Sequence, residues 1–376
     1  MNIAVLVAGL PPERIGGAER QACELARRLA LHHAVTVFTR TATIPSELAG
    51  VPTCVVTQRT RIGLRRVRFA ADLVETLLHF RRSATRFDVI VAFQSVIDGL
   101  IGVFAKFVFG TPLVVLIRGA SEYRGQSVQS RWLTPLVIQH ADRVGVQSIA
   151  LRDDVVSVLE ASRRRAVAST IRTKLFVSPN GIDLPPPLRS GQPHGLLCVA
   201  RLTPEKGVGV LIDAMRRCPS EHLTIVGDGP ERAVLEQAAR DLSNVTFVGA
   251  VAHARVMEYM MRAKVLVLPS QYEGQPNVVM EAMALGIPVI ATRVGGLPDL
   301  ISDGTTGLLI PPGDASAIAG AIHQISDDDA LRARLAENGR LAIRPYDWAI
   351  VLERFERMLD EVVATRRASE AATIAL

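Results

Sequence analysis

The chain has 376 residues, of which 48% are hydrophobic, and its formal net charge is +6. This length suggests two or three domains, and the apolar content excludes a globally disordered chain. The four cysteines are widely scattered without C-x-x-C or metal-ligand spacing, which is typical of a reduced, cytosolic protein.

The N-terminal run 1–9 is apolar but short and has no basic flank, so it predicts a buried strand and not a signal peptide. The most membrane-like run spans residues 95–117, where Asp98, Lys106 and Gly110 interrupt it. A membrane-spanning helix needs about 20 uninterrupted apolar residues. We therefore predict a buried helix, a turn and a buried strand in this run.

Short apolar strands alternate with helical patterns through the first half of the chain. The expected strands are 3–7, 34–39, 54–56, 88–92, 113–117, 143–147 and 174–177, and the expected helices are 18–30, 64–82 and 150–159. Continuous apolar strands between helices predict a parallel sheet covered on both faces.

The same alternation restarts after a Pro-rich stretch, 184–193, that has the composition of a linker. The expected strands are 195–200, 223–226, 245–248, 265–269, 288–292 and 307–310, and the expected helices are 207–217, 231–241, 254–262, 277–285, 315–326, 329–344 and 348–364, followed by a frayed tail. The pattern predicts two doubly wound α/β domains, 1–183 and 194–345, with ligands bound at the carboxyl ends of strands, facing a cleft between the domains.

Two carboxylates flank the predicted start of a helix. Glu273 lies in the loop, Pro276 fits the first helical position, Glu281 lies about one turn into the helix, and Gly286 ends it. The free N–H groups at that helix start form an anion site between the carboxylates. Such a site suits a ligand with phosphates and hydroxyls, for example a nucleotide sugar, although two solvated glutamates on a surface helix remain an alternative.

Other loops that follow predicted strands carry suitable chemistry. Arg201 offers a planar donor fork and Lys206 a mobile point charge, so together they could neutralise a diphosphate without a metal. Gly229 would let backbone approach a ligand closely, although Gly-Asp-Gly is also ordinary turn chemistry. Val251 follows a strand where backbone groups could contact a base.

Gly16 and Gly17 precede the first predicted helix and could bind phosphate at its N-terminus. Their spacing does not match G-x-G-x-x-G, and no acidic residue ends the second strand. A bound dinucleotide is therefore disfavoured.

Several short runs occur in a characteristic order: GGAER from Gly16, PNGID from Pro179, ARLTPEKG from Ala200, VGDGP from Val226, PSQYEGQPN from Pro269, GIPVI from Gly286 and VGGLP from Val294. Together they resemble the retaining glycosyltransferases of family 4, which have the two-domain GT-B fold. The resemblance covers nearly the whole chain.

This resemblance implies a hexosyltransferase-type enzyme that uses a UDP- or GDP-linked sugar, with no metal or other cofactor. It implies that Arg201 and Lys206 hold the donor diphosphate, that Glu281 binds the ribose, and that Glu273 lies near the transferred sugar. It further implies contacts to the donor or acceptor from Gly16, Gly17, Val251, Gly274, Gln275, Pro276 and Asn277. The final helix is expected to cross back and brace the first domain.

The chain departs from the family pattern after the predicted strand 113–117. Many relatives carry a His there, whereas this chain has Arg118. An arginine could stabilise phosphate charge but could not act as a base, because its guanidinium stays protonated.

Charge is unevenly distributed, with 24 Lys and Arg against 13 Asp and Glu in residues 1–180. Much of the excess lies at Arg59, Arg61, Arg65, Arg66, Arg68, Arg81, Arg82, Arg86 and residues 163–165. A basic amphipathic helix can bind an anionic membrane surface, so we expect peripheral association with the inner face of the cytoplasmic membrane and a lipid-linked or polysaccharide-precursor acceptor. A solvated basic face is the alternative, and nucleic acid is disfavoured because aromatic residues are scarce.

Three other functions would account for part of this pattern. A glycosidase also uses two carboxylates, but it leaves Arg201 and Lys206 unexplained. A nucleotide-sugar epimerase on a similar fold and a catalytically inactive partner subunit both remain open.

Overall fold

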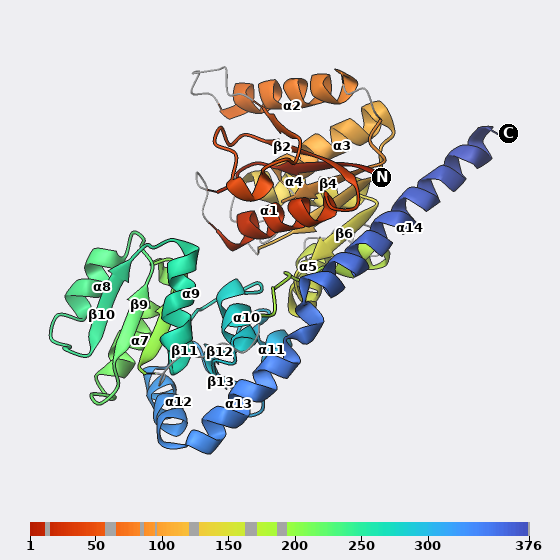
Figure 1. The fold of residues 1–376 in the computed structure, drawn as a ribbon. Helices are drawn as coiled ribbons and strands as arrows, with labels where there is room; N and C mark the ends of the chain where they lie inside the picture. The colour runs from red at the N-terminus through yellow and green to blue at the C-terminus, as the bar shows by residue number, and fades with distance from the viewer. Residues whose placement is uncertain are drawn as a thin grey trace. The chain divides into compact units, whose positions relative to one another are not determined.

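The computed structural model describes residues 1–11, 16–56, 65–82, 86–94, 96–119, 128–161, 171–185 and 194–374. The chain divides into two compact units, Met1–Gly181 with Ala349–Leu376, and Ile182–Trp348 (Figure 1). Of the linker expected at 184–193, residues 186–193 lie outside the described part, as do Arg59, Arg61 and residues 163–165 of the basic stretches.

The first unit is built on a seven-stranded sheet in the order β3-β2-β1-β4-β5-β6-β7. Its strands are β1 (Asn2–Val7), β2 (Ala34–Thr39), β3 (Thr53–Val55), β4 (Val89–Phe93), β5 (Leu113–Ile117), β6 (Arg143–Val146) and β7 (Leu175–Val177). All neighbouring strands are parallel. Strands β4 and β5 are buried at every residue, as expected where helices cover both faces of a parallel sheet.

The helices of the first unit are α1 (Gly17–Leu29), α2 (Arg65–Arg82), α3 (Ile97–Phe109), α4 (Val128–His140) and α5 (Ile149–Ala161), with a 3-10 turn η1 (Ser46–Leu48). Helix α3 contacts both α2 and α4 and packs on β1, β4 and β5. The close packing depends on Gly102, where a Cβ would lie 2.5 Å from a methyl carbon of Leu113.

The structure differs from the prediction at two helices of this unit. Helix α4 was not predicted, because Pro135 inside it is a residue that usually ends or kinks a helix. The helix predicted within residues 95–117 exists as α3, but it is not wholly buried, since Phe104, Phe107 and Val108 are exposed.

The last helix, α14 (Trp348–Ile374), is longer than the predicted 348–364 and replaces the expected frayed tail. It packs on the first unit: Phe355 lies against Phe176, with ring centroids 6.4 Å apart, and Arg367 pairs with Asp88 at 3.0 Å. Asp88 immediately precedes β4, so α14 runs along the edge of the sheet where strands begin.

The second unit is built on a six-stranded parallel sheet in the order β10-β9-β8-β11-β12-β13. Its strands are β8 (Leu196–Val199), β9 (Leu223–Val226), β10 (Val245–Gly249), β11 (Val265–Leu268), β12 (Val289–Thr292) and β13 (Leu308–Ile310). Alternate residues of a strand face opposite sides, so Leu196 and Cys198 pack in one apolar core while Leu197 packs in another.

Helices cover both faces of this second sheet. They are α7 (Val208–Met215), α8 (Arg232–Ala238), α9 (His253–Arg262), α10 (Asn277–Ala284), α11 (Leu297–Leu300), α12 (Ala315–Asp327) and α13 (Asp329–Ala342), with 3-10 turns η3 (Pro204–Lys206) and η4 (Arg344–Tyr346). Residues of α7 and α12 fill the core on one face, and residues of α9, α10 and α11 fill the core on the other. The two doubly wound sheets predicted from the sequence are therefore present.

Candidate active site

The candidate site of the second unit lies where its strand order reverses. Strands β8 and β11 are neighbours, and the chain moves away from them in opposite directions across the sheet. In open α/β sheets, ligands bind beyond the carboxyl ends of strands at such a switch point. Lys206 follows β8 and Glu273 follows β11, so both residues lie at this point.

Lys206 and Glu273 form an ion pair with 2.7 Å between Nζ and Oε1. The Glu273 side chain is only 8% exposed and that of Lys206 22% exposed. Ser270, which is fully buried, donates its hydroxyl to the same Glu273 oxygen at 2.7 Å. A buried carboxylate held by a cation and a hydroxyl is fixed in one orientation, as a group acting on a substrate needs to be.

Backbone hydrogen bonds hold the Glu273 loop from both sides. The Gln271 N–H donates to the Glu205 carbonyl at 2.8 Å, and the Gly296 N–H donates to the Glu273 carbonyl at 3.1 Å. At Gly295, with φ +50°, a Cβ would lie 1.8 Å from the Glu273 carbonyl oxygen. The loop therefore depends on glycine at residue 295 for its position.

Arg201 lies outside the Lys206–Glu273–Ser270 cluster. Its guanidinium is 66% exposed and pairs with Glu205 at 3.3 Å. Burial would raise the pKa of Glu205, but polar contacts to its carboxylate and the positive charge of Arg201 outweigh burial and lower it. Glu205 thus stays charged and holds Arg201 near the end of β8.

The turn around Gly229 packs directly against the loop that follows β8. The Leu202 N–H donates to the Asp228 carbonyl at 2.9 Å, and a Cβ on Gly229 would lie 2.3 Å from the Leu202 carbonyl oxygen. Close backbone packing is therefore sufficient to explain glycine at residue 229.

Helix α10 begins at Asn277, as predicted, but Pro276 is not its first helical residue, because with φ −74° and ψ 117° it caps the helix from outside. Gln275 and Pro276 are buried, while Gly274 and Asn277 are half-buried. The helix therefore starts at Asn277, directly after the Glu273 loop, with its positive dipole end beside the ion pair.

Glu281, in the second turn of α10, is buried. Its Oε1 lies 3.7 Å from Nε2 of His253, the first residue of α9. Val251 lies two residues earlier in the loop after β10 and is half-buried against the core that includes α10. Glu281 thus lies beside the β10–α9 loop that carries Val251.

In the first unit, Arg118 directly follows β5 and is anchored by several neighbours. It donates to the Ser178 carbonyl at 3.0 Å and to Asn180 Oδ1 at 3.3 Å, and its guanidinium lies over the Phe93 ring at 5.3 Å. Arg118 also lines a small hollow together with Gln94. The hollow lies at the carboxyl edge of the sheet.

Gly16 and Gly17 begin α1 next to the same hollow, which Ala18 and Glu19 also line. Gly16 is extended, with φ −159°, and a Cβ there would lie 2.3 Å from a Glu19 carboxylate oxygen. Gln94, at the end of β4, has φ +88°, an uncommon conformation for a residue with a side chain and one found at functional sites.

Several residues around these sites were not predicted from the sequence. Ser270, His253 and Gln94 are ordinary residue types, and only their contacts distinguish them. Ser270 does lie three residues before Glu273, and His253 two after Val251, which are the signals that could have drawn attention to them. Within the described residues, no group of three or more His, Cys, Asp or Glu side chains could hold a metal ion.

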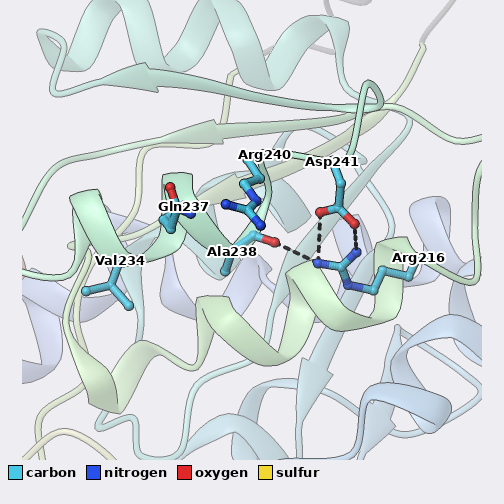
Figure 2. Close-up of a pocket in the computed structure, with 6 residues that line it drawn as sticks. All are labelled: Arg216, Val234, Gln237, Ala238, Arg240 and Asp241. Carbon is cyan, nitrogen blue, oxygen red and sulfur yellow. Dashed lines mark hydrogen bonds and ion pairs between the residues drawn. The ribbon is translucent and has the colours of Figure 1, made fainter.

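An open depression lies elsewhere on the second unit, between the C-terminal ends of α7 and α8 (Figure 2). Arg216 crosses it, pairs with Asp241 and donates to the Ala238 carbonyl at 2.7 Å. Because α7 and α8 start at the carboxyl edge of the sheet and run back, the depression lies at the opposite edge. Its central charges already pair with each other, so it is not a candidate for the reaction.

Both halves of the chain match known families. Residues 15–185 match the family described as Glycosyltransferase Family 4, and residues 185–342 match the family described as Glycosyl transferases group 1.

Pairwise identity to individual relatives is low or limited to part of the chain. Over 278 residues the chain is 24% identical to an uncharacterized glycosyltransferase of Methanocaldococcus jannaschii, a match covering 73% of this chain and 76% of that protein. Over 167 residues it is 36% identical to the phosphatidyl-myo-inositol mannosyltransferase of Mycobacterium leprae, covering 43% of this chain and 44% of that protein. The second match thus spans less than half of the relative.

Among solved structures, the Anabaena protein HepE in complex with UDP-glucose has a TM-score of 0.78 to this chain. The match covers 96% of this chain and 100% of HepE at 21% sequence identity. At that identity, the similarity establishes a shared fold.

Proposed function

Because the chain belongs to the group 1 and family 4 glycosyltransferases and has their GT-B fold, we propose that it transfers a sugar from a nucleoside diphosphate sugar with retention at the anomeric carbon. The predicted family and fold are confirmed, and the protein is a glycosyltransferase. An epimerase and an inactive partner subunit are not favoured, since the matched relatives are named as transferases.

The observation that carries the proposal is the Lys206–Glu273 ion pair at the switch point of the second sheet. In the proposed reaction the bond between the anomeric carbon and a diphosphate oxygen breaks, and a bond to the acceptor hydroxyl oxygen forms on the same face. The proton of that hydroxyl passes to the departing phosphate oxygen, so no separate general acid is required.

Lys206 carries a positive charge that can stabilise the negative charge of the departing diphosphate. Its ammonium is partly exposed and can share its charge between Glu273 and a diphosphate at the start of α10. Arg201 is exposed and can reach the same phosphates once it leaves Glu205. One fixed donor aimed at developing negative charge typically contributes about 3 kcal/mol to transition-state stabilisation.

Other residues of the second unit would bind the remaining parts of the nucleotide-sugar donor. We propose that Glu281 accepts hydrogen bonds from the ribose, that the backbone near Val251 contacts the base, and that Glu273 faces the sugar. The complex of HepE with UDP-glucose supports a UDP-linked donor. A panel of UDP- and GDP-sugars, read by thermal shift, would identify the base and the sugar.

For the acceptor we propose a lipid-linked or polysaccharide-precursor glycan, with the protein bound peripherally to a membrane. The basic first half supports this proposal, as does the similarity to a phosphatidyl-myo-inositol mannosyltransferase. Within the described ranges, no helix is both long enough and apolar enough to cross a bilayer.

The experiment that tests the proposed function compares Lys206→Ala and Glu273→Ala with a matched control, Lys264→Ala. Lys264 forms a similar partly buried pair with Glu221 at 3.3 Å, but it lies before β11, at the opposite edge of the same sheet. We expect the first two variants to lose sugar transfer by about a hundredfold or more, and the control to retain it. Near-native transfer by Lys206→Ala or Glu273→Ala would contradict the assignment.

A further inference from the structure

Helix α3 exposes apolar side chains on the face where a surface helix normally carries polar ones. Phe104, Phe107 and Val108 have the spacing of residues on one helix face, and Phe107 and Val108 are 65% and 61% exposed. Because the opposite face already packs on the sheet, this second apolar face has no role in the core.

The exposed face of α3 continues onto α4. The Phe107 ring lies 5.2 Å from the ring of His140 at the end of α4, and Leu136 lies one helical turn before His140. On another side, α3 meets α2 through the half-buried Phe109 and the buried Phe80, whose ring centroids lie 5.8 Å apart. Figure 1 shows α2 and α3, both in orange, beside each other. We call the exposed apolar surface of α3 and α4 the apolar face, and it consists of Phe104, Phe107, Val108 and Leu136.

Exposed apolar residues outside α2, α3 and α4 are isolated and do not form a cluster. Leu31 and Val234 are 69% and 67% exposed, but each is the one large exposed apolar residue described on its turn or helix. Scattered residues of that kind are normal, whereas a contiguous apolar patch with polar surroundings marks an interaction site.

The charges around the apolar face are predominantly positive. Arg81 and Arg82, in the last turn of α2, are exposed, and neither forms an ion pair with a described residue. Among the carboxylates described on the three helices, Glu75 is half-buried and Asp98 is buried. A partner that is both apolar and anionic would therefore be complementary to this surface.

We propose that the apolar face docks on an anionic lipid bilayer. Phe104, Phe107 and Val108 enter the boundary between headgroups and acyl chains, about 5–10 Å deep, while Arg81 and Arg82 meet anionic headgroups. Docking of this kind would bring the enzyme to a lipid-linked acceptor, and in this respect the inference rests on the proposed function. The binding of the apolar face to the bilayer does not depend on that function.

The docked orientation leaves the reactive edge of the first unit open. Phe107 and Val108 lie at the C-terminal end of α3, toward the edge where the strands of the sheet begin. Arg118 and the start of α1 at Gly16 lie at the other edge. Docking therefore does not cover the residues expected to face the substrates.

Cosedimentation of the full chain with vesicles tests the proposal. One set of vesicles contains phosphatidylcholine alone, and the other contains about 30% phosphatidylglycerol, at about 0.1 M salt. We expect binding to the anionic vesicles, with a decrease of about tenfold in Phe107→Ser/Val108→Ser and a similar decrease in Arg81→Gln/Arg82→Gln. The matched controls are Leu31→Ser and Val234→Ser, which remove exposed apolar residues outside the apolar face and should bind as the parent does.

Three outcomes would overturn the proposal: equal binding to both kinds of vesicle, no loss of binding in the Phe107→Ser/Val108→Ser variant, or a parent dimer that this variant separates in sedimentation velocity. The last outcome would assign the face to a second copy of the chain. Binding of UDP-sugars, measured on the same variants without vesicles, should be unchanged. Failure of docking is therefore distinguishable from failure of the proposed function.

Discussion

The Lys206–Glu273 pair should show strong energetic coupling, which a double-mutant cycle can measure without any substrate. The cycle compares the parent, Lys206→Met, Glu273→Gln and the double variant. At 2.7 Å between Nζ and Oε1, two unit charges attract by about 6 kcal/mol at an effective dielectric constant of 20. Lys206 is partly exposed, and desolvation opposes the attraction, so we expect a net coupling of about 2 kcal/mol.

Scanning calorimetry measures this coupling as a departure from additivity in the melting temperature. The second unit spans Ile182–Trp348, and for a unit of that size about 1 kcal/mol corresponds to about 2–4 °C. The double variant should therefore melt about 4–8 °C above the temperature expected from adding the two single effects. The Lys264–Glu221 pair, with a longer separation of 3.3 Å, serves as the control cycle and should couple more weakly. Additivity within about 0.5 kcal/mol at Lys206–Glu273 would refute the idea that Lys206 holds the buried carboxylate in place.

Three further predictions concern the surroundings of this pair and the cysteines. Ser270→Ala removes a buried hydrogen bond to Glu273, so kcat should fall about tenfold with little change in donor KM, and an unchanged kcat in steady-state assays would contradict a positioning role. Gly295→Ala places a Cβ 1.8 Å from the Glu273 carbonyl oxygen at φ +50°, so thermal unfolding should show a loss of about 2–4 kcal/mol, and unchanged stability would show that the loop relaxes freely. Burial raises the pKa of Cys23 and Cys198 to about 12, so near pH 8 both should stay protonated and resist Ellman's reagent until the protein is unfolded, whereas rapid reaction in the native protein would show that they are accessible.

The alternation of strands and helices was predictable from the sequence because each strand of a parallel sheet is a short apolar run. The strand predicted at 88–92, for example, is β4 at Val89–Phe93. Surface helices were harder to predict. Helix α4 contains Pro135, and the last turns of α14 have few apolar residues but are supported by ion pairs such as Arg366–Glu370 at 3.0 Å.

The proximity of Lys206 and Glu273 follows from the strand order. The two residues lie 67 positions apart, and they meet because β8 and β11 are neighbours at the switch point. Each residue could be singled out by type and position after a strand. The contribution of Ser270 could not, because a serine after a strand has many uses and only its burial against Glu273 identifies it.

The exposure of α3 was missed for a related physical reason. Its composition is so apolar that the sequence predicts burial on all sides. A helix that is covered on all sides and a helix whose outer side is left open can have equally apolar sequences. Exposure depends on which neighbours cover the outer side, and that information is not contained in the spacing of apolar residues.

The measurement that tests the account most directly is calorimetric titration of UDP into the parent, Lys206→Ala, Glu273→Ala and Lys264→Ala. If Lys206 binds the donor diphosphate and Glu273 faces the sugar, the parent and Lys264→Ala should bind UDP equally, Lys206→Ala should bind about tenfold or more weakly, and Glu273→Ala should change little. GDP replaces UDP if the donor panel selects it. Equal binding of the selected diphosphate by the parent and Lys206→Ala would contradict the account, as would the absence of binding by the parent to either diphosphate.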